Sequence, residues 1–333
     1  METSTSKLVE KGTYGCAFSP PLPCKKTKAT KKKGKLIGKV TTKRDETDVE
    51  LSISNLVSAI PNYSSYFIVQ EIDNCTPSNF AQLRKTYATS CPQIKDSADT
   101  DLTQLLSFHG GTDLHRLQFP SNFQMKSSLR HVLQAVQLLQ KQGICHSDLH
   151  SGNLVRDIRG TLRILDFGSA FLGDTVSENF VKRYLTWYSP IYDQQPPEFT
   201  VLNAIHDGVN VNYAITEIMR GKKLIAIAQN YLGWGMGLDE QEDALRNFFR
   251  TEDHYAIARE NPVEFFHRFW RKIDVWGVGD VFVKVLKKSL LSPHFIETQW
   301  KQDGPTIKLV LKGLLQCDPT QRLSVEKALE LLG

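Results

Sequence analysis

The chain has 333 residues, of which 41% are hydrophobic and 23% charged, and its formal net charge is +5. This composition excludes wholesale disorder and fibrous repeats, and no apolar run approaches the roughly 18 residues of a membrane helix. The six cysteines form no Cys-x-x-Cys pair, so we expect a reducing compartment and neither a zinc site nor a disulfide framework. Residues 1–7 are polar, unlike a signal peptide, and we therefore expect a cytoplasmic protein with no membrane partner.

The positive charge is concentrated near the N-terminus. Residues 1–61 contain 12 Lys and Arg against 6 Asp and Glu, and most of the excess comes from lysines between Lys25 and Lys35. Such a run can bind nucleic acid or an anionic surface. No aromatic side chains are interleaved with it, as single-strand binding requires. The pattern favours a solvated loop between two strands over a nucleic-acid site.

Short apolar runs alternate with turn residues in the first third of the chain, which indicates a small β-rich region. Strands are predicted within 7–18, where glycines mark a turn, and over 35–40, 66–70 and 102–108. A helix is predicted over 49–60, because apolar residues recur there at helical spacing before Pro61. The stretch between the last two strands is rich in Ser, Thr and Asn and carries no predicted element.

Helical patterns dominate the rest of the chain. An amphipathic helix is predicted to end at Gly143, and a short hairpin is predicted to turn at 157–160. From Glu198 onward the pattern is helical and contains no repeat. The sequence therefore predicts an α+β fold, with a small β-rich lobe followed by a larger helical lobe.

Two features of the first third suit a phosphate-bearing ligand. Glycines in a turn, here Gly12 and Gly15, let backbone amides approach phosphate oxygens because no Cβ intervenes, although such a turn is more often an ordinary hairpin. Lys39 on a predicted strand and Glu50 on the next helix match a lysine held toward phosphates by a glutamate. Alone, a Lys–Glu pair is more often a surface salt bridge.

The strongest chemical signal lies in the middle of the chain. Asp148 and Asn153 are five residues apart in a predicted loop, and a predicted strand runs directly into Asp166 of an Asp-Phe-Gly sequence. These residues supply a base and two magnesium ligands. Phosphoryl transfer needs both, because metal ions neutralise charge on the transferring group while the base orients the acceptor. Either half alone is better explained as turn capping; both halves in this order favour catalysis.

Two later motifs extend the pattern. Asp274 opens an apolar helix, and Arg322 precedes the last predicted helix. Each alone is better explained as a helix start or cap. With all these motifs in this order, the sequence resembles the eukaryotic-type protein kinase family over nearly the whole chain.

The resemblance implies a bilobal fold that binds ATP and magnesium. Gly12 and Gly15 would cover the nucleotide phosphates, and Ala17 would touch the adenine. Lys39 would hold the α- and β-phosphates in a pair with Glu50.

The resemblance also implies lobe boundaries. Residues 1–106 would form the N-lobe and 107–333 the C-lobe. Leu106 would guard the back of the adenine pocket, and the hinge would run from Ser107 to His109.

In the C-lobe, the resemblance implies a catalytic centre. Asp148 would be the catalytic base, and Asn153 and Asp166 would be the magnesium ligands. Asp274 would brace the catalytic loop from below.

The connection 199–273 is much longer than is usual in this family, and it follows Glu198, which would pair with Arg322. Its many large apolar side chains predict that it packs on the helical lobe, with a partner-docking surface as the alternative. With the lysine-rich segment, this insertion is similar to kinases of large DNA viruses. That narrower resemblance would place the protein in a host cytoplasm or a virion.

Three positions depart from the family pattern. Glu10 stands where the first glycine of the phosphate loop is usual, which predicts a stiffer loop. Ser147 replaces the usual arginine of the catalytic loop, and His150 replaces a lysine typical of serine/threonine kinases. The second change weakens the assignment of the acceptor.

Three functions fit the residues. The first is a protein kinase that moves the γ-phosphoryl group of ATP to Ser or Thr of a protein substrate. The second is a small-molecule kinase of the aminoglycoside or choline type, and the third is a pseudokinase that acts as a binding module. The Pro-Pro-Glu198 motif, Asp274 and Arg322 favour a protein kinase over the second, and the presence of every catalytic residue disfavours the third.

Overall fold

The computed structural model describes residues 6–11, 15–25, 36–42, 44–70, 74–98, 101–117, 123–185, 187–233 and 238–333. Gly12 and most of the lysine-rich segment lie outside these residues. The chain divides into two compact units: Met1–Gly111 with Leu165–Ser169, and Thr112–Ile164 with Ala170–Gly333. The N-lobe predicted from the sequence ends at 106, shortly before the first unit does.

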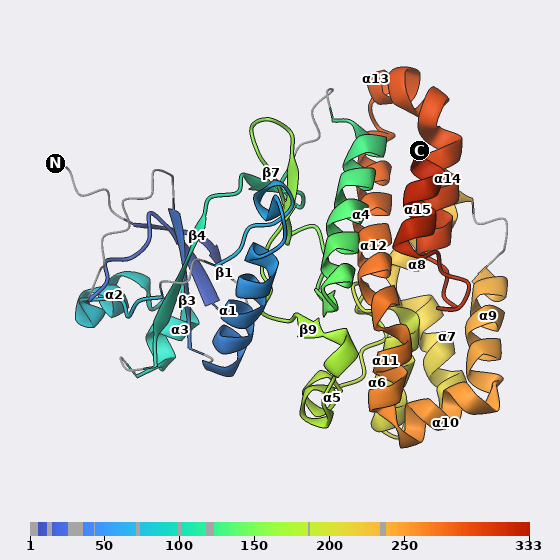
Figure 1. The fold of residues 1–333 in the computed structure, drawn as a ribbon, viewed down its shortest axis with the longest axis horizontal. Coiled ribbons are helices and arrows are strands. Elements are labelled where there is room, and N and C mark those ends of the chain that lie inside the picture. The colour runs from blue at the N-terminus through green and yellow to red at the C-terminus, as the bar shows by residue number, and fades with distance from the viewer. Residues whose placement is uncertain are drawn as a thin grey trace. The chain divides into compact units, whose positions relative to one another are not determined.

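The first unit is built on an antiparallel sheet of four strands in the order β1-β2-β3-β4 (Figure 1). The strands are β1 Lys7–Lys11, β2 Gly15–Ser19, β3 Leu36–Thr41 and β4 Thr103–Phe108. Three of the four predicted strand regions are thereby confirmed. The strand predicted over 66–70 is wrong: the chain makes the 3₁₀ turn η1, Tyr63–Ser65, and an irregular segment follows. Phe67 alone is deeply buried there, and it packs edge-on against Phe167 rather than alternating along a strand.

Three helices accompany the sheet: α1 Arg44–Ser58, α2 Phe80–Tyr87 and α3 Pro92–Asp96. The predicted helix is α1, although it begins earlier than expected. The sequence did not predict α2 and α3. They contribute Phe80, Leu83 and Ile94 to a core with Phe18 and Val40 of the sheet. A few apolar residues in a polar stretch therefore cover one face of the sheet.

Two disulfides contradict the expectation drawn from the cysteines. Cys16 bonds to Cys91 and Cys24 to Cys75, with Cα–Cα distances of 6.1 and 5.8 Å. The partners are 75 and 51 residues apart, and the packing of residues 74–98 on the sheet brings them together. Cys145 and Cys317 are free and buried. The cysteines therefore give no support for a reducing compartment.

The second unit contains short strands that shape its loops. β5 Thr112–Asp113, β7 Leu154–Arg156 and β8 Leu162–Ile164 form one small sheet, and β6 Ile144–Cys145 pairs with β9 Phe171–Leu172. The predicted hairpin is confirmed as β7–β8. At its turn, Oδ1 of Asp157 accepts hydrogen bonds from the amides of Arg159 and Thr161, and Gly160 has a φ of 92° that favours glycine.

Helices make up most of the second unit (Figure 1). They are α4 Met125–Lys141, α5 Glu178–Tyr184, α6 Pro197–His206, α7 Val211–Gly221, α8 Lys223–Leu232, α9 Leu238–Arg250, α10 Glu252–Glu260, α11 Pro262–Phe269, α12 Ile273–Ser289, α13 Pro293–Phe295, α14 Lys301–Leu314 and α15 Val325–Leu332. Short turns also occur at η2 Gly173–Thr175, η3 Trp270–Lys272 and η4 Ile296–Trp300. The predicted amphipathic helix is α4, and Gly143 beyond its end has a φ of 70°. The buried helix α12 packs against α4, α8 and α14.

The 199–273 segment is packed as the sequence predicted. Phe265, Phe266 and Trp270 are at most 1% exposed, and Phe266 lies edge-on to Tyr184 with ring centroids 4.9 Å apart. Trp234, another of the large apolar residues of this segment, lies outside the described residues. None of the described helices is long and apolar enough to cross a membrane.

Candidate active site

Lys39 is the centre of a charged cluster in the first unit. Its amine on β3 lies 3.0 Å from Oε2 of Glu50 on α1 and 2.7 Å from Oδ1 of Asp166. Gln70 donates to the other oxygen of Glu50 at 2.7 Å, which fixes the carboxylate. Burial lowers the pKa of Lys39, but the two carboxylates outweigh burial and raise the pKa overall, so the amine stays charged.

The sheet register places further predicted residues on the Lys39 face. Directly opposed residues of antiparallel strands share a face, and Ala17 and Leu105 both oppose Lys39. Ser107 is two residues from Leu105 and lies on the same face. Leu106 opposes Gly38 and lies on the other face. The structure thus brings Ala17 and Ser107 to the side of Lys39, and it brings Leu105 there in place of Leu106.

Three other residues were predicted to bind the nucleotide, and the register places Gly15 on the Lys39 face as well, opposite Thr41. Gly15 lies at the start of β2, where an added Cβ would be only 2.7 Å from the carbonyl oxygen of Val40. The backbone there tolerates glycine alone. His109 is exposed just beyond β4, and Gly12 lies outside the described residues.

The loop that carries Asp148 is held from beneath in the second unit. The carboxylate of Asp274 accepts hydrogen bonds from the amides of His146 and Ser147, at 2.8 and 2.9 Å. Asp274 is 1% exposed, and burial raises its pKa while these two donors oppose the rise. Ser147 has a φ of 61°, uncommon for a residue with a side chain. The bracing predicted for Asp274 is therefore present.

Two side chains of the same loop converge on Asp148. Nδ2 of Asn153 donates to the carbonyl oxygen of Asp148 at 2.9 Å, so this contact does not use the amide oxygen of Asn153. Nδ1 of His150 accepts the amide hydrogen of Gly152 at 3.0 Å, which leaves the proton of the neutral ring on Nε2. That nitrogen lies 3.7 Å from Oδ2 of Asp148. His150 therefore directs an N–H toward the carboxylate.

Arg322 and Glu198 form a buried ion pair in the second unit. Arg322 donates two hydrogen bonds of 2.7 Å to the two oxygens of Glu198, and both side chains are fully buried. The predicted pair is confirmed. Since removal of one partner would leave an uncompensated charge in the interior, the pair fixes α6 relative to the C-terminal helices.

The segment before α6 carries contacts that the sequence did not reveal. The amine of Lys222, at the start of α8, donates to the carbonyl oxygens of Tyr192 and Gln195. Nε1 of Trp276 donates to the carbonyl oxygen of Asp193 at 2.9 Å, and Lys284 lies 3.3 Å from the carboxylate of Asp193. These contacts join residues far apart in the chain, and no spacing rule signals them.

A family model described as the protein kinase domain matches residues 11–190, more than half of the chain. The chain belongs to the protein kinase family. The four-stranded sheet of the first unit and the helices of the second are the small and large lobes of this α+β fold.

The kinase is also similar to the serine/threonine-protein kinase fray2 of Dictyostelium discoideum, with 29% identity over 136 residues. The match covers 36% of this chain and 12% of that relative. The similarity is therefore confined to a small part of a much longer protein.

The kinase has suitable donors for magnesium. Mg²⁺ prefers oxygen ligands and is usually held by one or two side chains together with substrate phosphates. Asp166 offers a carboxylate and Asn153 an amide oxygen, which fits that preference. Among the described residues no group of three or more His, Cys, Asp and Glu side chains is arranged for a metal, and a site completed by phosphates needs none.

Proposed function

We propose that this kinase transfers the γ-phosphoryl group of ATP to Ser or Thr hydroxyls of protein substrates. The observation that carries the proposal is the bridging of Glu50 and Asp166 by Lys39. A permanently charged amine fixed by two carboxylates is suited to hold phosphates, because its position does not depend on the nucleotide.

The residues on the Lys39 face would receive the nucleotide. Lys39 would bind the α- and β-phosphates, Gly12 and Gly15 would bring backbone amides to them, and Ala17 would contact the adenine. Ser107 to His109 would form the hinge. At the back of the pocket Leu105 fits better than Leu106, since Leu105 is fully buried and shares the Lys39 face.

The catalytic loop would act on the acceptor. Magnesium, when bound by Asp166 and Asn153, neutralises charge on the phosphates. Asp148 would accept the proton of the acceptor hydroxyl, and Asn153 would keep the Asp148 carboxylate oriented through its hydrogen bond to the backbone of Asp148. His150 would supply the hydrogen-bond donor near Asp148 where many relatives carry lysine.

Acceptor analysis tests this proposal. The full chain is incubated with γ-labelled ATP and Mg²⁺, with mixed protein substrates in one arm and small alcohols and amines in the other. We expect label in phosphoserine and phosphothreonine after acid hydrolysis. Label on small molecules only would establish the aminoglycoside or choline type of reaction, and no label from a protein that binds ATP would establish a pseudokinase.

We further propose that the kinase is of the type found in large DNA viruses and acts in the cytoplasm of a host cell or in a virion. The long packed segment 199–273 and the lysine-rich N-terminal region support this origin. The disulfides offer a test of location, because a reducing cytoplasm would keep all six cysteines as thiols. Thiol alkylation before lysis, read by mass spectrometry, separates the two locations. Modification of Cys16 and Cys91 would place the protein in a reducing cytoplasm, whereas their protection would match the disulfide of the structure and contradict a cytoplasmic location.

A further inference from the structure

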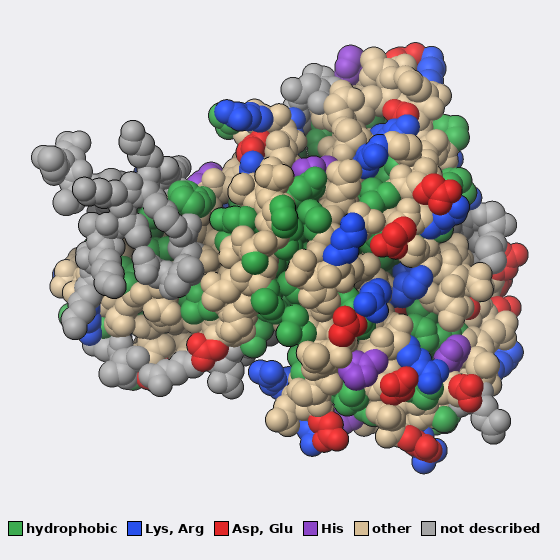
Figure 2. Space-filling view, viewed as in Figure 1, with side chains coloured by type: hydrophobic (Ala, Val, Ile, Leu, Met, Phe, Trp, Pro, Cys, Tyr) green, Lys and Arg blue, Asp and Glu red, His purple; other side chains and the backbone are tan. Residues whose placement is uncertain are grey.

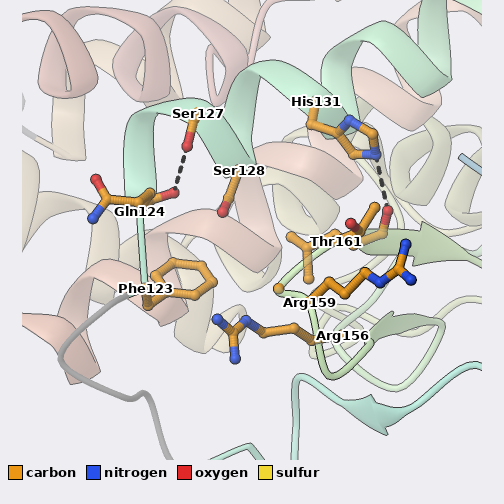
Figure 3. A pocket seen from close by; sticks show the side chains of 10 residues that line it. Phe123, Gln124, Ser127, Ser128, His131, Arg156, Arg159 and Thr161 are labelled. Carbon is orange, nitrogen blue, oxygen red and sulfur yellow. Dashed lines mark hydrogen bonds between the residues drawn. The ribbon is translucent and has the colours of Figure 1, made fainter. Parts of the chain in front are cut away.

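A cavity of about 390 Å³ lies in the second unit between the first turns of α4 and the β7–β8 hairpin. Ser127, Ser128 and His131 line it from the helix, and Arg156 and Arg159 line it from the hairpin (Figure 3). None of the residues assigned to phosphoryl transfer lines this cavity. Its volume is in the range of small-ligand sites.

The charge of the cavity is positive and uncompensated. No described lining residue is acidic, and neither arginine forms an ion pair with a described carboxylate. Asp157, the acidic residue of the hairpin, forms an ion pair with Arg163, in which Oδ2 lies 2.9 Å from Nη1. Figure 2 shows Lys or Arg side chains at the tip of this hairpin. The cavity therefore attracts anions.

Arg156 carries a specific signal for a missing partner. Its Nε atom is buried and has no hydrogen-bond acceptor. A buried donor without an acceptor costs about 1–3 kcal/mol, and more for a charged group, so such atoms are rare unless a ligand completes them. A guanidinium group binds a phosphate or carboxylate through two parallel hydrogen bonds. Nε itself is closed off, so an anion in the cavity would bind the part of the guanidinium group that lines the cavity.

The helix wall adds a neutral donor. Ser128 brings a hydroxyl group to the cavity, whereas the hydroxyl of Ser127 already donates to the carbonyl oxygen of Gln124 at 3.3 Å. Nε2 of His131 donates to the carbonyl oxygen of Leu162 at 3.0 Å and thereby ties α4 to the hairpin. The two walls are thus held in place before any ligand binds, which reduces the entropy lost on binding.

We propose that this cavity binds a phosphorylated serine or threonine side chain of a protein segment. A phosphate monoester offers three acceptor oxygens to two guanidinium groups and the Ser128 hydroxyl. Phe123 and Leu162 also line the cavity, but both are at most 3% exposed, so the polar groups would carry the recognition. A nucleic acid fits less well, because Phe123 is only 3% exposed and the His131 ring is hydrogen-bonded to the carbonyl oxygen of Leu162, so the lining offers no platform for successive bases.

A docking site of this kind would serve the proposed kinase reaction by holding a substrate that has already been phosphorylated elsewhere. That consequence rests on the proposed function, whereas binding itself does not. Binding is therefore measured without ATP. The catalytically impaired Asp166→Asn variant should bind the phosphopeptide as the wild type does.

The test is fluorescence anisotropy of the full chain with a short fluorescein-labelled peptide that contains phosphoserine next to leucine. Its serine and glutamate counterparts, inorganic phosphate and a labelled single-stranded oligonucleotide are measured in parallel. Arg156→Gln and Arg159→Gln should each weaken phosphopeptide binding by about tenfold or more, the loss expected for a charge-assisted hydrogen bond. Arg130→Gln is the matched control, because Arg130 is an exposed arginine on the same helix outside the cavity lining.

The proposal predicts that the serine peptide binds at least about tenfold more weakly than the phosphopeptide. Because Arg159 is exposed, its variant should fold normally even if Arg156→Gln lowers the melting temperature. Equal binding of the serine peptide, loss of binding in Arg130→Gln as large as in Arg159→Gln, or arginine-dependent binding of the oligonucleotide alone would overturn the proposal. Binding of inorganic phosphate without binding of the phosphopeptide would also overturn it.

Discussion

The hydroxyl of Tyr192 donates a hydrogen bond of 3.3 Å to Oδ1 of Asp148. Tyr192 is 43% exposed and lies in the segment that Lys222 and Trp276 hold in place. If Asp148 is the base, a phenolic hydroxyl occupies the position in which the base would receive a substrate hydroxyl. Tyr192 would then compete with the acceptor for Asp148.

Tyr192→Phe should raise kcat/KM for a protein substrate about two- to tenfold, because a typical hydrogen bond contributes about 0.5–1.5 kcal/mol net. Initial rates with a saturating ATP concentration and varied protein substrate measure this change. The KM for ATP should not move. A fall in kcat/KM would show instead that Tyr192 assists the acceptor.

Lys39→Met should reduce phosphoryl transfer by at least about 10²-fold, because a fixed positive charge on the phosphates is lost. The same change leaves Glu50, which is nearly buried, without its cation. Lys39→Met/Glu50→Gln should therefore be more stable than Lys39→Met but equally inactive. Thermal melts without nucleotide, paired with transfer assays, separate the two effects. Recovery of activity in the double variant would assign Lys39 a structural role only.

Phosphate-free protein should be active at once. In relatives with arginine before the catalytic aspartate, a phosphate on the activation segment neutralises that charge. Ser147 carries no charge, and its amide is already held by Asp274. The protein is dephosphorylated, checked by mass spectrometry, and assayed for initial rate. A lag that ends with autophosphorylation, and that Thr175→Ala or Ser177→Ala makes permanent, would contradict this prediction.

Lys222 should make stability depend on pH. Burial lowers its pKa from 10.5 to about 8, although nearby acids including Asp193 oppose the shift. Between these two values the unfolded chain binds more protons than the folded one, so the free energy of unfolding rises with pH. Below pH 8 the group is charged in both states and adds no slope.

The comparison with Lys222→Met isolates this group. From pH 8 to 10.5, the free energy of unfolding of the wild type should rise by up to about 3 kcal/mol relative to the variant. Urea unfolding at several pH values measures the difference. A difference that stays level or falls across this range would show that Lys222 does not titrate as a buried amine.

Local motifs point to the residues proposed for catalysis. Asp148 and Asn153 lie in one loop, and Asp166 directly follows one strand. Their spacing along the chain is therefore visible in the sequence without knowledge of long-range packing. The Lys39–Glu50 pair was also predictable, since it joins a strand to the next helix. The structure confirms this pair and the pairing of Glu198 with Arg322.

Long-range packing could not be predicted. The two disulfides join residues 75 and 51 positions apart, and α2 and α3 form in a polar stretch because a few apolar residues meet the sheet. Leu106 shows a different limit. Alternate residues of a strand face opposite sides of the sheet. The strand register puts Leu105 on the Lys39 face, so a prediction displaced by one position selects Leu106 on the other face.

In the proposed function, Asp166 supports phosphoryl transfer through magnesium and Asp148 supports it through its carboxylate. The most direct test is the rate of transfer from γ-labelled ATP to protein by wild type and Asp166→Asn at several Mg²⁺ concentrations. We expect phosphoserine or phosphothreonine from the wild type and a loss of at least about 10³-fold in Asp166→Asn with an unchanged fold by circular dichroism. Near wild-type transfer by a folded Asp166→Asn protein would contradict the account.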